Sequence, residues 1–479
     1  MNTYLAVDLG ATSGRTVVAS YDGSRLAMRE LTRFDNPQLP ICGHTFWNLP
    51  HLYNEVLRAL RQVKAEGIAL DSIGIDTWGC DVAFIGADGQ LLGLPYCYRD
   101  AHTDGAPERY FADRMPRREV YERTGIQFMP FNTLFQLYQL RCEKSSALAA
   151  AAKVLFVPDA LIYMLTGEYV CEQTVASTSQ MLDPRTGDLD EALLHSVGLE
   201  RSQFGRLVKA GERVGTLTAQ VQEATGLGAV PVVAVGSHDT ASAVAAVPAS
   251  DEHFAYLSCG TWSLLGVESA TPIITAESMA VNFTNEGGLD GTTRFLKNIT
   301  GLWIFEQCRK EWQREEAATG QPLIPADVNA LNALSLTSSC QSIINPDDAR
   351  FAHPASMTAA INEYLAEHGQ PVPLTPADYV RVIFRSLAAR YSDVIATLRR
   401  LTGVDIQRLH VIGGGSRNEF LMQFAADAIG LPVIAGPQEG TALGNVLAQM
   451  RASGLVASLT QMRDVVARSI ELRTYTPAS

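Results

Sequence analysis

The chain has 479 residues, a length that corresponds to two or three domains. Hydrophobic residues make up 47% of it and charged residues 19%, so it has ample material for a buried core. The net charge of -13 argues against a protein that binds the nucleic-acid backbone, because that binding depends on lysine and arginine. We therefore expect no nucleic-acid partner.

The N-terminal segment MNTYLAVDLGATSGR lacks the basic start and long apolar middle of a signal peptide. No apolar stretch is long enough to span a bilayer. The eight cysteines form no CxxC pair, which disfavours a zinc site and a secreted disulfide framework. These features predict a cytoplasmic protein without a membrane partner.

The first half of the chain begins with a predicted β-hairpin. A strand over residues 3–8 is followed by a glycine-rich turn over 9–15 and a returning strand over 16–21. The elements predicted after it are a helix over 51–67, a strand over 70–79, helices over 130–150 and 155–167, and a turn over 184–187.

The second half repeats this pattern from about residue 253. HFAYLSCGTWSLLGVES has the shape of the first hairpin, and RLHVIGGGSRNEFLMQFAADAIG reads as strand, glycine turn and amphipathic helix. Such self-similarity predicts two halves of related architecture joined near residues 246–252, although chance would also explain a match this weak. Each half would be an α/β domain with a mixed sheet flanked by helices. A ligand would then bind in the cleft between the two halves.

Three glycine-containing turns are candidates for binding phosphate. DLGATSGR offers backbone N–H groups, the hydroxyls of Thr12 and Ser13, and the Arg15 guanidinium, and Asp8 could hold the water shell of Mg²⁺. SCGTW carries Thr261, and the GGG run that includes Gly414 opens a helix. Taken alone, the DLGATSGR and GGG turns are equally well explained as ordinary connections, and SCGTW is better explained as an ordinary hairpin, but the three together describe a phosphate clamp. No P-loop motif is present.

GSHDTASAV contains the candidate catalytic group. Ser237 is a plausible N-cap for the helix that follows, and Asp239 would lie in its first turn, where the helix dipole favours an acid. That arrangement explains Asp239 without any function. Alternatively, an ionised Asp239 orients a substrate hydroxyl and accepts its proton in phosphoryl transfer. His238 alone is more often a hydrogen-bonded structural residue, and no second histidine stands at metal-ligand spacing.

The segment DTWGCD forms the polar end of the strand predicted over 70–79. Trp78 offers an apolar face for a sugar ring, and Asp76 and Thr77 offer hydrogen bonds. A turn at the strand end with a buried tryptophan explains the segment slightly better.

At this point the motifs resemble those of the FGGY carbohydrate kinases, within the actin-like ATPase superfamily. The similarity runs over nearly the whole chain and keeps the family's order, and it is strongest to the branch that acts on L-rhamnulose. The segments that carry it are DLGATSGR, GIDTWGCD, PYCYRD, GIQFMPFNTLFQL, GSHDTASAV, YLSCGTWSL, NEGG, LKNITGLW, VIGGGSRN and AGPQEGTALGN.

The resemblance implies two ribonuclease H-like domains, an N-terminal one over residues 1–247 for sugar and phosphate and a C-terminal one over 248–479 for the nucleotide. It implies that ATP, with Mg²⁺, phosphorylates the C1 hydroxyl of L-rhamnulose in L-rhamnose breakdown. We expect a monomer. The nucleotide contacts carried over are Ala11, Thr12, Ser13, Gly14, Arg15, Thr261, Glu306 and Gly414.

The sugar contacts that the resemblance implies are Gly79, His238, Asp239, Thr240 and Asn298, with Asp239 as proton acceptor. Two positions depart from the family pattern. Glu306 stands where a glutamine is expected, with Gln307 beside it, and Cys259 stands where a serine is expected. Two other functions remain open: a kinase for another ketose such as L-fuculose, and a nucleotide-binding module that needs neither a sugar pocket nor Asp239.

Overall fold

The computed structural model describes residues 1–352 and 354–478. The chain forms two compact units, and it returns to the first unit twice after leaving it. The boundary expected between residues 247 and 248 stays a prediction. It divides the sequence into two consecutive segments, whereas each unit is assembled from three separate ones. The first unit comprises Met1–Ser250, Glu268–Phe295 and Gly440–Ser469, and the second comprises Asp251–Val267, Leu296–Glu439 and Ile470–Ser479.

The first unit is built on a six-stranded mixed sheet in the order β13-β14-β6-β1-β2-β3. β1 pairs antiparallel with β2 and parallel with β6, and β14 is also parallel to β6. The strands are β1 (Asn2–Leu9), β2 (Ser13–Tyr21), β3 (Leu26–Asp35), β6 (Ser72–Thr77), β13 (Arg213–Thr216) and β14 (Pro231–Val233).

The first hairpin has a shorter turn than the sequence predicts. Only Gly10–Thr12 connect β1 and β2, because Leu9 pairs with Gly14 and Asp8 with Arg15. The polar residues at the start of β2 continue the ladder, and hydropathy gives no sign of this. The strand predicted over 70–79 is β6, and the helix predicted over 51–67 is α1 (Leu49–Ala65).

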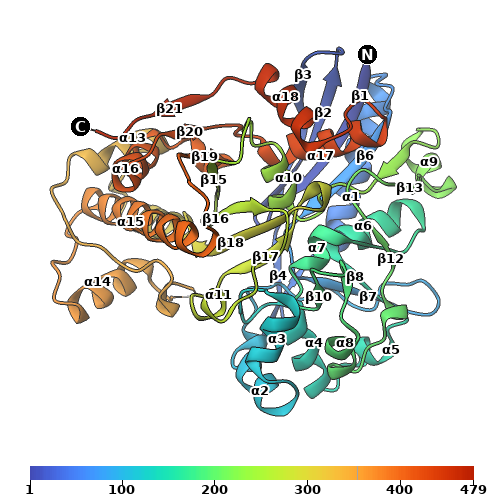
Figure 1. Cartoon of the computed structure of the whole chain (residues 1–479), viewed down its shortest axis with the longest axis horizontal. Helices are drawn as coiled ribbons and strands as arrows, with labels where there is room; N and C mark the ends of the chain where they lie inside the picture. The colour runs from blue at the N-terminus through green and yellow to red at the C-terminus, as the bar shows by residue number, and fades with distance from the viewer. Residues whose placement is uncertain (353, 479) are drawn as a thin grey trace. The chain divides into compact units, whose positions relative to one another are not determined.

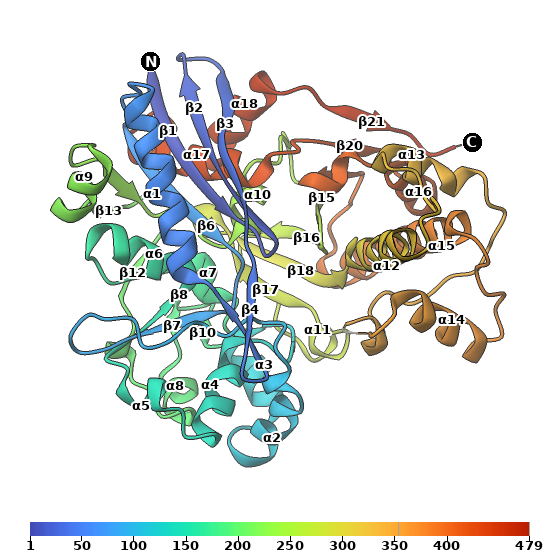
Figure 2. The same cartoon turned by 180° about the vertical axis from the view of Figure 1, so that it is seen from behind.

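Helices cover both faces of this sheet. Leu49, Leu52, Val56, Leu60 and Val63 of α1 are fully buried, and their spacing of three and four residues puts them on one side of the helix. α1 contacts β2 and β3, and it lies in front of the sheet in the view of Figure 2. α10 (Asp239–Ala245) and α17 (Gly440–Ala452) contact β6 from the opposite side, which faces the viewer in Figure 1.

The rest of the first unit contains short strands and helices. Its other helices are α2 (Ala106–Asp113), α3 (Arg117–Thr124), α4 (Thr133–Cys142), α5 (Ser146–Ala150), α6 (Val157–Thr166), α7 (Gln173–Ser177), α8 (Glu191–Ser196), α9 (Ala219–Thr225), α11 (Ala276–Ala280) and α18 (Leu459–Ser469). Four two-stranded sheets pair β4 (Gln38–Ile41) with β5 (His44–Trp47), β7 (Val82–Ile85) with β8 (Lys153–Phe156), β9 (Val170–Glu172) with β12 (Arg206–Val208), and β10 (Leu182–Asp183) with β11 (Asp188–Leu189).

The helix predicted over 130–150 is two helices, α4 and α5. Lys144 between them has a positive φ of 56°, which no α-helix continues through. Ser145 then caps α5 by accepting a hydrogen bond from the Leu148 N–H. The turn predicted over 184–187 connects β10 and β11.

A second mixed sheet has seven strands in the order β17-β18-β16-β15-β19-β20-β21. Along the chain, β16 and β18 each pass from one unit into the other. The strands are β15 (Phe254–Cys259), β16 (Trp262–Ser269), β17 (Thr284–Gly287), β18 (Thr293–Thr300), β19 (Arg408–Ile412), β20 (Val433–Ala435) and β21 (Arg473–Tyr475).

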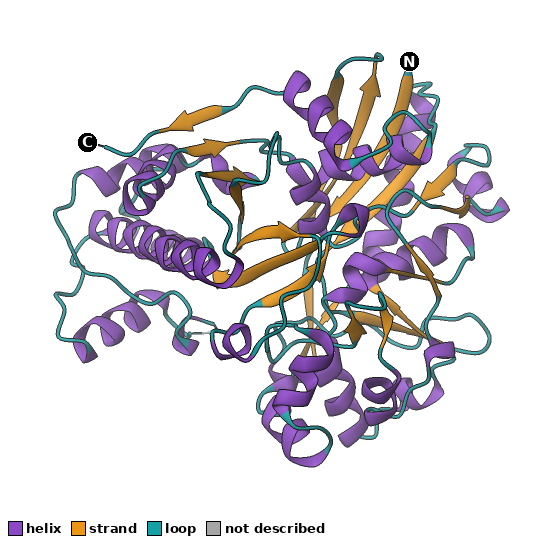
Figure 3. Cartoon of the chain, viewed as in Figure 1, coloured by secondary structure: helices purple, strands orange, loops and turns teal. Residues whose placement is uncertain are grey.

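The helices of the second unit include a long one, α15, which packs against α16. Thr375 and Asp378 form a capping box at the start of α15, and Gly403 ends it with a φ of 71°. Figure 3 shows the helices beside the strands. They are α12 (Trp303–Thr319), α13 (Val328–Ala333), α14 (Met357–Glu367), α15 (Pro376–Thr402) and α16 (Glu419–Ile429).

The predicted internal repeat is present in the topology. β15 pairs antiparallel with β16 and parallel with β19, as β1 pairs antiparallel with β2 and parallel with β6. The glycine turns of the two hairpins therefore occupy equivalent positions. Among the described residues, no helix is long and apolar enough to cross a membrane.

The crossing of α17 over α10 depends on a glycine. A Cβ atom on Gly444 would overlap the backbone carbonyl of Ser242 in α10. The next residue, Asn445, and Gln449, which lies four positions after it on the same side of the helix, are completely buried, and α17 contacts both β1 and β6.

We predict that Gly444→Ala lowers the free energy of unfolding by about 2–3 kcal/mol, because the methyl group forces two packed backbones apart. Urea unfolding followed by circular dichroism measures this change. Gly228→Ala is the matched control, since Gly228 is exposed and an added Cβ there meets no atom within 4 Å. Equal stability of the two variants would contradict the packing argument.

Candidate active site

The β1–β2 turn is held by interactions that the sequence did not predict. Asn36, which follows β3, donates its backbone N–H to the Thr12 carbonyl and its side-chain Nδ2 to the Gly10 carbonyl, both at 3.0 Å. Thr12 is exposed, and Ala11 and Ser13 are half-buried. Gly14 is buried, and a Cβ there would overlap the Phe34 ring. The turn therefore presents Ala11, Thr12 and Ser13, whereas Gly14 is required for packing.

Asp8 and Arg15 are opposite each other in the hairpin and form an ion pair. Arg15 donates from Nε at 2.9 Å and from Nη2 at 2.7 Å to the same oxygen, Oδ2 of Asp8. The two residues predicted to act on a metal and on phosphate are thus neighbours.

Asp76 lies beside Asp8 because β6 runs parallel to β1 in this register. Its side chain is fully buried, accepts a hydrogen bond from Asn445 Nδ2 at 2.6 Å, and leaves Oδ1 without a partner. Burial, followed by the charge of Asp8, raises the pKa of Asp76 well above its ordinary value, and the charge of Asp239 adds to this. Asp8, Asp76 and Asp239 therefore share one acidic environment in the first unit.

Asp239 is the first residue of α10, as the sequence predicts, but Ser237 is not the cap. His238 occupies the N-cap position without a side-chain capping bond, and the buried Ser237 hydroxyl instead donates to the Val235 carbonyl at 3.4 Å. Ser237 is drawn into the sheet because its carbonyl accepts the Thr77 N–H at 2.9 Å. The prediction of a Ser237 cap is therefore wrong.

The Asp239 side chain is 32% exposed, and its two oxygens differ. The Thr240 hydroxyl donates to Oδ1 at 3.0 Å, and His238 Nε2 lies 3.5 Å from the same atom. Both of these side-chain contacts are made by Oδ1. Burial raises the pKa of Asp239, while the hydrogen bond from the Thr240 hydroxyl acts against that shift.

His238 is contacted on its other side by a buried ion pair. Arg294 Nη2 lies 3.0 Å from His238 Nδ1 and 3.1 Å from Glu286 Oε2. Arg294 has no exposed surface, and Glu286 is 4% exposed. Glu286 belongs to the NEGG segment, to which the sequence assigned no role, and nothing in the sequence pointed to Arg294.

Trp78 does not offer a free ring face. It is 6% exposed and packs against Trp47, with ring centroids 4.1 Å apart and the ring planes tilted by 37°. The explanation of a buried tryptophan at a strand end is therefore correct. Gly79 follows it in a tight position, since a Cβ there would overlap the Thr178 side chain.

Asp81 holds this aromatic cluster together. Its carboxylate accepts hydrogen bonds from Trp47 Nε1 at 2.5 Å, Trp78 Nε1 at 2.9 Å, Gln136 Nε2 at 2.8 Å and the Tyr98 N–H at 3.1 Å. Burial raises the pKa of Asp81 to about 7, although these four hydrogen bonds act against the shift. Tyr98 thereby gives the PYCYRD segment a packing role.

The second unit contains a pocket of about 460 Å³ that brings together three predicted site residues, Thr261, Glu306 and Gly414. Glu306 lines it, whereas Gln307 is not among the lining residues. The complete lining set is Gly260, Thr261, Leu302, Phe305, Glu306, Val328, Asn329, Asn332, Gly414, Gly415, Arg417 and Asn418. Asn298 lies on β18 and is not part of this pocket.

Two glycines of this pocket differ in the space that they leave for a side chain. A Cβ on Gly414 would meet no atom within 4 Å, so the position faces open space. A Cβ on Gly415 would overlap the Sγ of Cys259. Burial raises the pKa of Cys259 to about 12, so this departure from the expected serine adds no reactive thiolate near neutral pH.

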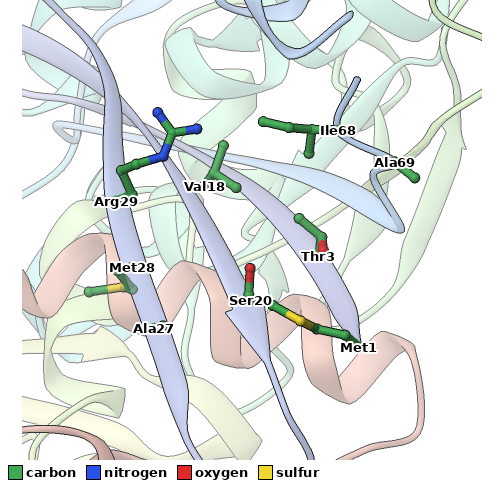
Figure 4. Close-up of a pocket in the computed structure, with 9 residues that line it drawn as sticks. All are labelled: Met1, Thr3, Val18, Ser20, Ala27, Met28, Arg29, Ile68 and Ala69. Carbon is green, nitrogen blue, oxygen red and sulfur yellow. The ribbon is translucent and has the colours of Figure 1, made fainter. Parts of the chain in front are cut away.

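Another pocket, of about 450 Å³, lies on the outer part of the first sheet and offers little chemistry (Figure 4). Its lining residues come from β1, β2, β3 and the segment before β6, and include no carboxylate or histidine. Arg29, the one charged side chain among them, is paired with Glu66 at 2.5 Å.

The chain matches two family models, the N-terminal domain of the FGGY family of carbohydrate kinases over residues 3–246 and its C-terminal domain over 255–453. It is 52% identical over 477 residues to a rhamnulokinase of Bacteroides thetaiotaomicron, covering 99% of this chain and 96% of that protein. A rhamnulokinase of Pectobacterium carotovorum is 43% identical and is covered to 92%.

Solved structures share the fold. Gluconate kinase and ligand-bound xylulose kinase, both from Lactobacillus acidophilus, each superpose with a TM-score of 0.79 at 16% identity. Each comparison covers 100% of this chain and 94% of the other. The two-domain fold with mixed sheets is therefore confirmed.

The raised pKa of Asp81 predicts that stability falls as pH rises. Between about pH 4 and pH 7 the buried carboxyl keeps a proton that the unfolded chain releases. This group therefore lowers the free energy of unfolding by up to ~1.4 kcal/mol for each unit by which the pH rises. We expect the free energy of unfolding of the wild type minus that of Asp81→Asn to decline from pH 5 to pH 7. Above pH 7 this value should level off. Urea unfolding of both proteins at several pH values tests this, and a difference that grows with pH would contradict it.

Proposed function

Because the chain belongs to the FGGY family of carbohydrate kinases, we propose that it transfers the γ-phosphoryl group of ATP to the C1 hydroxyl of L-rhamnulose. The product would be L-rhamnulose 1-phosphate, formed in L-rhamnose breakdown. The names of the relatives at 42–52% identity support this choice of sugar. The observation in the structure that carries the proposal is the environment of Asp239.

Asp239 would be the general base. Thr240 and His238 occupy the side of Oδ1, so Oδ2 is the oxygen that remains to accept a proton. The sugar hydroxyl oxygen attacks the γ-phosphorus, the bond from that phosphorus to the bridging oxygen breaks, and ADP leaves with the electron pair. The hydroxyl proton goes to Oδ2 of Asp239.

The nucleotide contacts in this proposal come from one turn of the first unit and one pocket of the second. The β1–β2 turn, Ala11 to Arg15, offers backbone N–H groups and hydroxyls to the phosphates. Thr261, Glu306 and Gly414 line the pocket of the second unit, whose volume is large enough for a nucleotide. In this proposal residues 248–479 would bind the nucleotide and residues 1–247 the sugar and the phosphates, and the pocket formed by Thr261, Glu306 and Gly414 supports the first part.

Mg²⁺ fits this acidic environment as an ion held through water. Among the described residues, no group of three or more His, Cys, Asp or Glu side chains is arranged to ligate a metal directly. Asp8 would hold the ion's water shell, and the unpartnered Oδ1 of Asp76 beside it is an orphaned acceptor in the same place. The ion would neutralise charge on the phosphates; Asp8 and Asp76 would orient its waters.

The sugar contacts proposed are Gly79, His238, Asp239, Thr240 and Asn298. The protein would act as a cytoplasmic monomer on two small-molecule substrates, without a nucleic-acid or membrane partner.

The test is ADP release with MgATP across L-rhamnulose, L-fuculose, L-ribulose, D-xylulose and glycerol, with a blank that lacks sugar. We expect strong turnover with L-rhamnulose alone. Turnover with a different ketose would reassign the substrate, and turnover equal to the blank with every sugar would refute the kinase.

Asp239→Asn is the matched variant in that assay. It is expected to lower kcat at least ~100-fold, the contribution of a positioned base, while the thermal unfolding temperature changes little. An Asn variant with full kcat would remove Asp239 from the mechanism and leave the kinase itself standing.

Substitutions at two adjacent glycines of the second unit test ligand binding and folding separately. Gly414→Ala puts a methyl group into the open pocket, so we predict a KM for ATP about three- to tenfold higher with unchanged stability. Gly415→Ala overlaps Cys259 and should lower the free energy of unfolding by about 1–3 kcal/mol. Initial rates against ATP concentration and thermal unfolding of both variants distinguish the effects, and a stable Gly414→Ala with unchanged KM would exclude this pocket as the nucleotide site.

A further inference from the structure

A line of buried polar side chains leads from the β17–β18 hairpin to Asp239. Glu286 of β17 and Arg294 of β18 form an ion pair, with 3.1 Å between Oε2 and Nη2. The same Nη2 lies 3.0 Å from His238 Nδ1, and His238 Nε2 lies 3.5 Å from Asp239 Oδ1. The side chains of Glu286, Arg294 and His238 are at most 9% exposed, against 32% for Asp239.

The contact with Arg294 determines where the His238 ring carries its proton. An arginine side chain only donates hydrogen bonds, so His238 Nδ1 accepts one from Nη2 at 3.0 Å; Glu286 Oε2 lies farther from the same atom, at 3.4 Å. A ring that accepts at Nδ1 is neutral, and its single proton is then on Nε2. That N–H lies on the side of the ring that faces Asp239 Oδ1.

The role left for Arg294 is to orient the His238 ring, because other contacts already hold the main chain of His238. The His238 backbone N–H donates to the Thr174 hydroxyl at 3.2 Å, so the main chain is already held from the opposite side. Arg294 itself is fixed by its Nε, which donates to the Gly287 carbonyl at 2.8 Å. A completely buried ion pair adds little stability compared with apolar side chains of similar volume, so packing alone does not account for Arg294.

We propose that Arg294 is a positioning residue: it holds His238 in the tautomer that turns Nε2–H toward Oδ1 of Asp239. Oδ2 of Asp239 is then the oxygen left facing the substrate hydroxyl. The consequence for catalysis rests on the proposed kinase activity, whereas the tautomer of His238 does not depend on any substrate.

The direct test is the ring ¹⁵N spectrum of the protein labelled in its nine histidines, without substrate. His238→Gln identifies the His238 signals by their loss. We expect His238 to be neutral with its proton on Nε2. A proton on Nδ1, or a doubly protonated ring at pH 7.5, would overturn the proposal, and this wild-type result does not require any Arg294 variant to fold.

A kinetic test uses two variants of the ion pair. Glu286→Gln with Arg294→Met removes both charges together, so no lone buried carboxylate remains. We expect kcat to fall about tenfold, the value of one hydrogen bond, with KM for the sugar nearly unchanged. Arg294→Lys keeps a cation and N–H donors, so it should recover most of the lost kcat.

The His238→Asn background shows whether Arg294 acts through His238. If it does, the double substitution at 286 and 294 causes no further loss of kcat there. A further full tenfold loss, or a folded variant with wild-type kcat, would overturn the proposal. If no sugar stimulates ADP release by the wild type, the proposed function fails, and the spectrum still decides the inference.

Discussion

The packing of α17 against β1 and β6 is the interaction on which the acidic centre of the first unit depends. Asn445 donates to Asp76 Oδ2 at 2.6 Å, Gln449 donates to Asn445 Oδ1 at 2.7 Å, and the Ser72 hydroxyl donates to Gln449 Oε1 at 2.7 Å. These side chains are almost completely buried, so each must satisfy its hydrogen bonds within the network. Asn445 and Gln449 approach the sheet this closely only because residue 74 of β6 is glycine, since a Cβ there would overlap both side chains.

The same network places a buried carboxylate, that of Asp76, next to the strand that leads into the β1–β2 turn. Asp76 is in register with Asp8, which is itself neutralised by Arg15. One fully buried acid, one paired acid and one partly exposed acid therefore occupy neighbouring positions, and their environments differ. Of the three, Asp239 has the most exposed carboxylate, at 32% against 11% for Asp8, and only Asp8 is paired with an arginine, so Asp239 suits the role of base better than Asp8 or Asp76.

The loop that carries His238 and Asp239 is held from two sides. Glu172 accepts the Ser237 N–H at 3.2 Å as well as bonds from Thr174, and burial raises the pKa of Glu172 to about 7. Glu286 and Arg294 hold the ring of His238 from the other side. Buried charged groups of this kind cost free energy, so their concentration around one short helix indicates a site in which orientation matters more than stability.

The sequence by itself determined the class of the fold, the two hairpins, the strand-turn-helix of the GGG segment and the position of Asp239 at a helix start, because periodicity and glycine placement are local properties. It also proposed Thr261, Glu306 and Gly414 together, and the structure places all three in one pocket. It misassigned the Ser237 cap, since the bond from Thr77 that draws Ser237 into the sheet joins residues 160 positions apart in the chain. Only the tertiary structure decided the neighbours of Asp239, the pairing of Arg15 with Asp8, and the roles of Asn36, Glu286, Arg294 and Asn445. These depend on strand register and on helix approach, which are set by packing between distant segments and leave no periodic signal in the sequence.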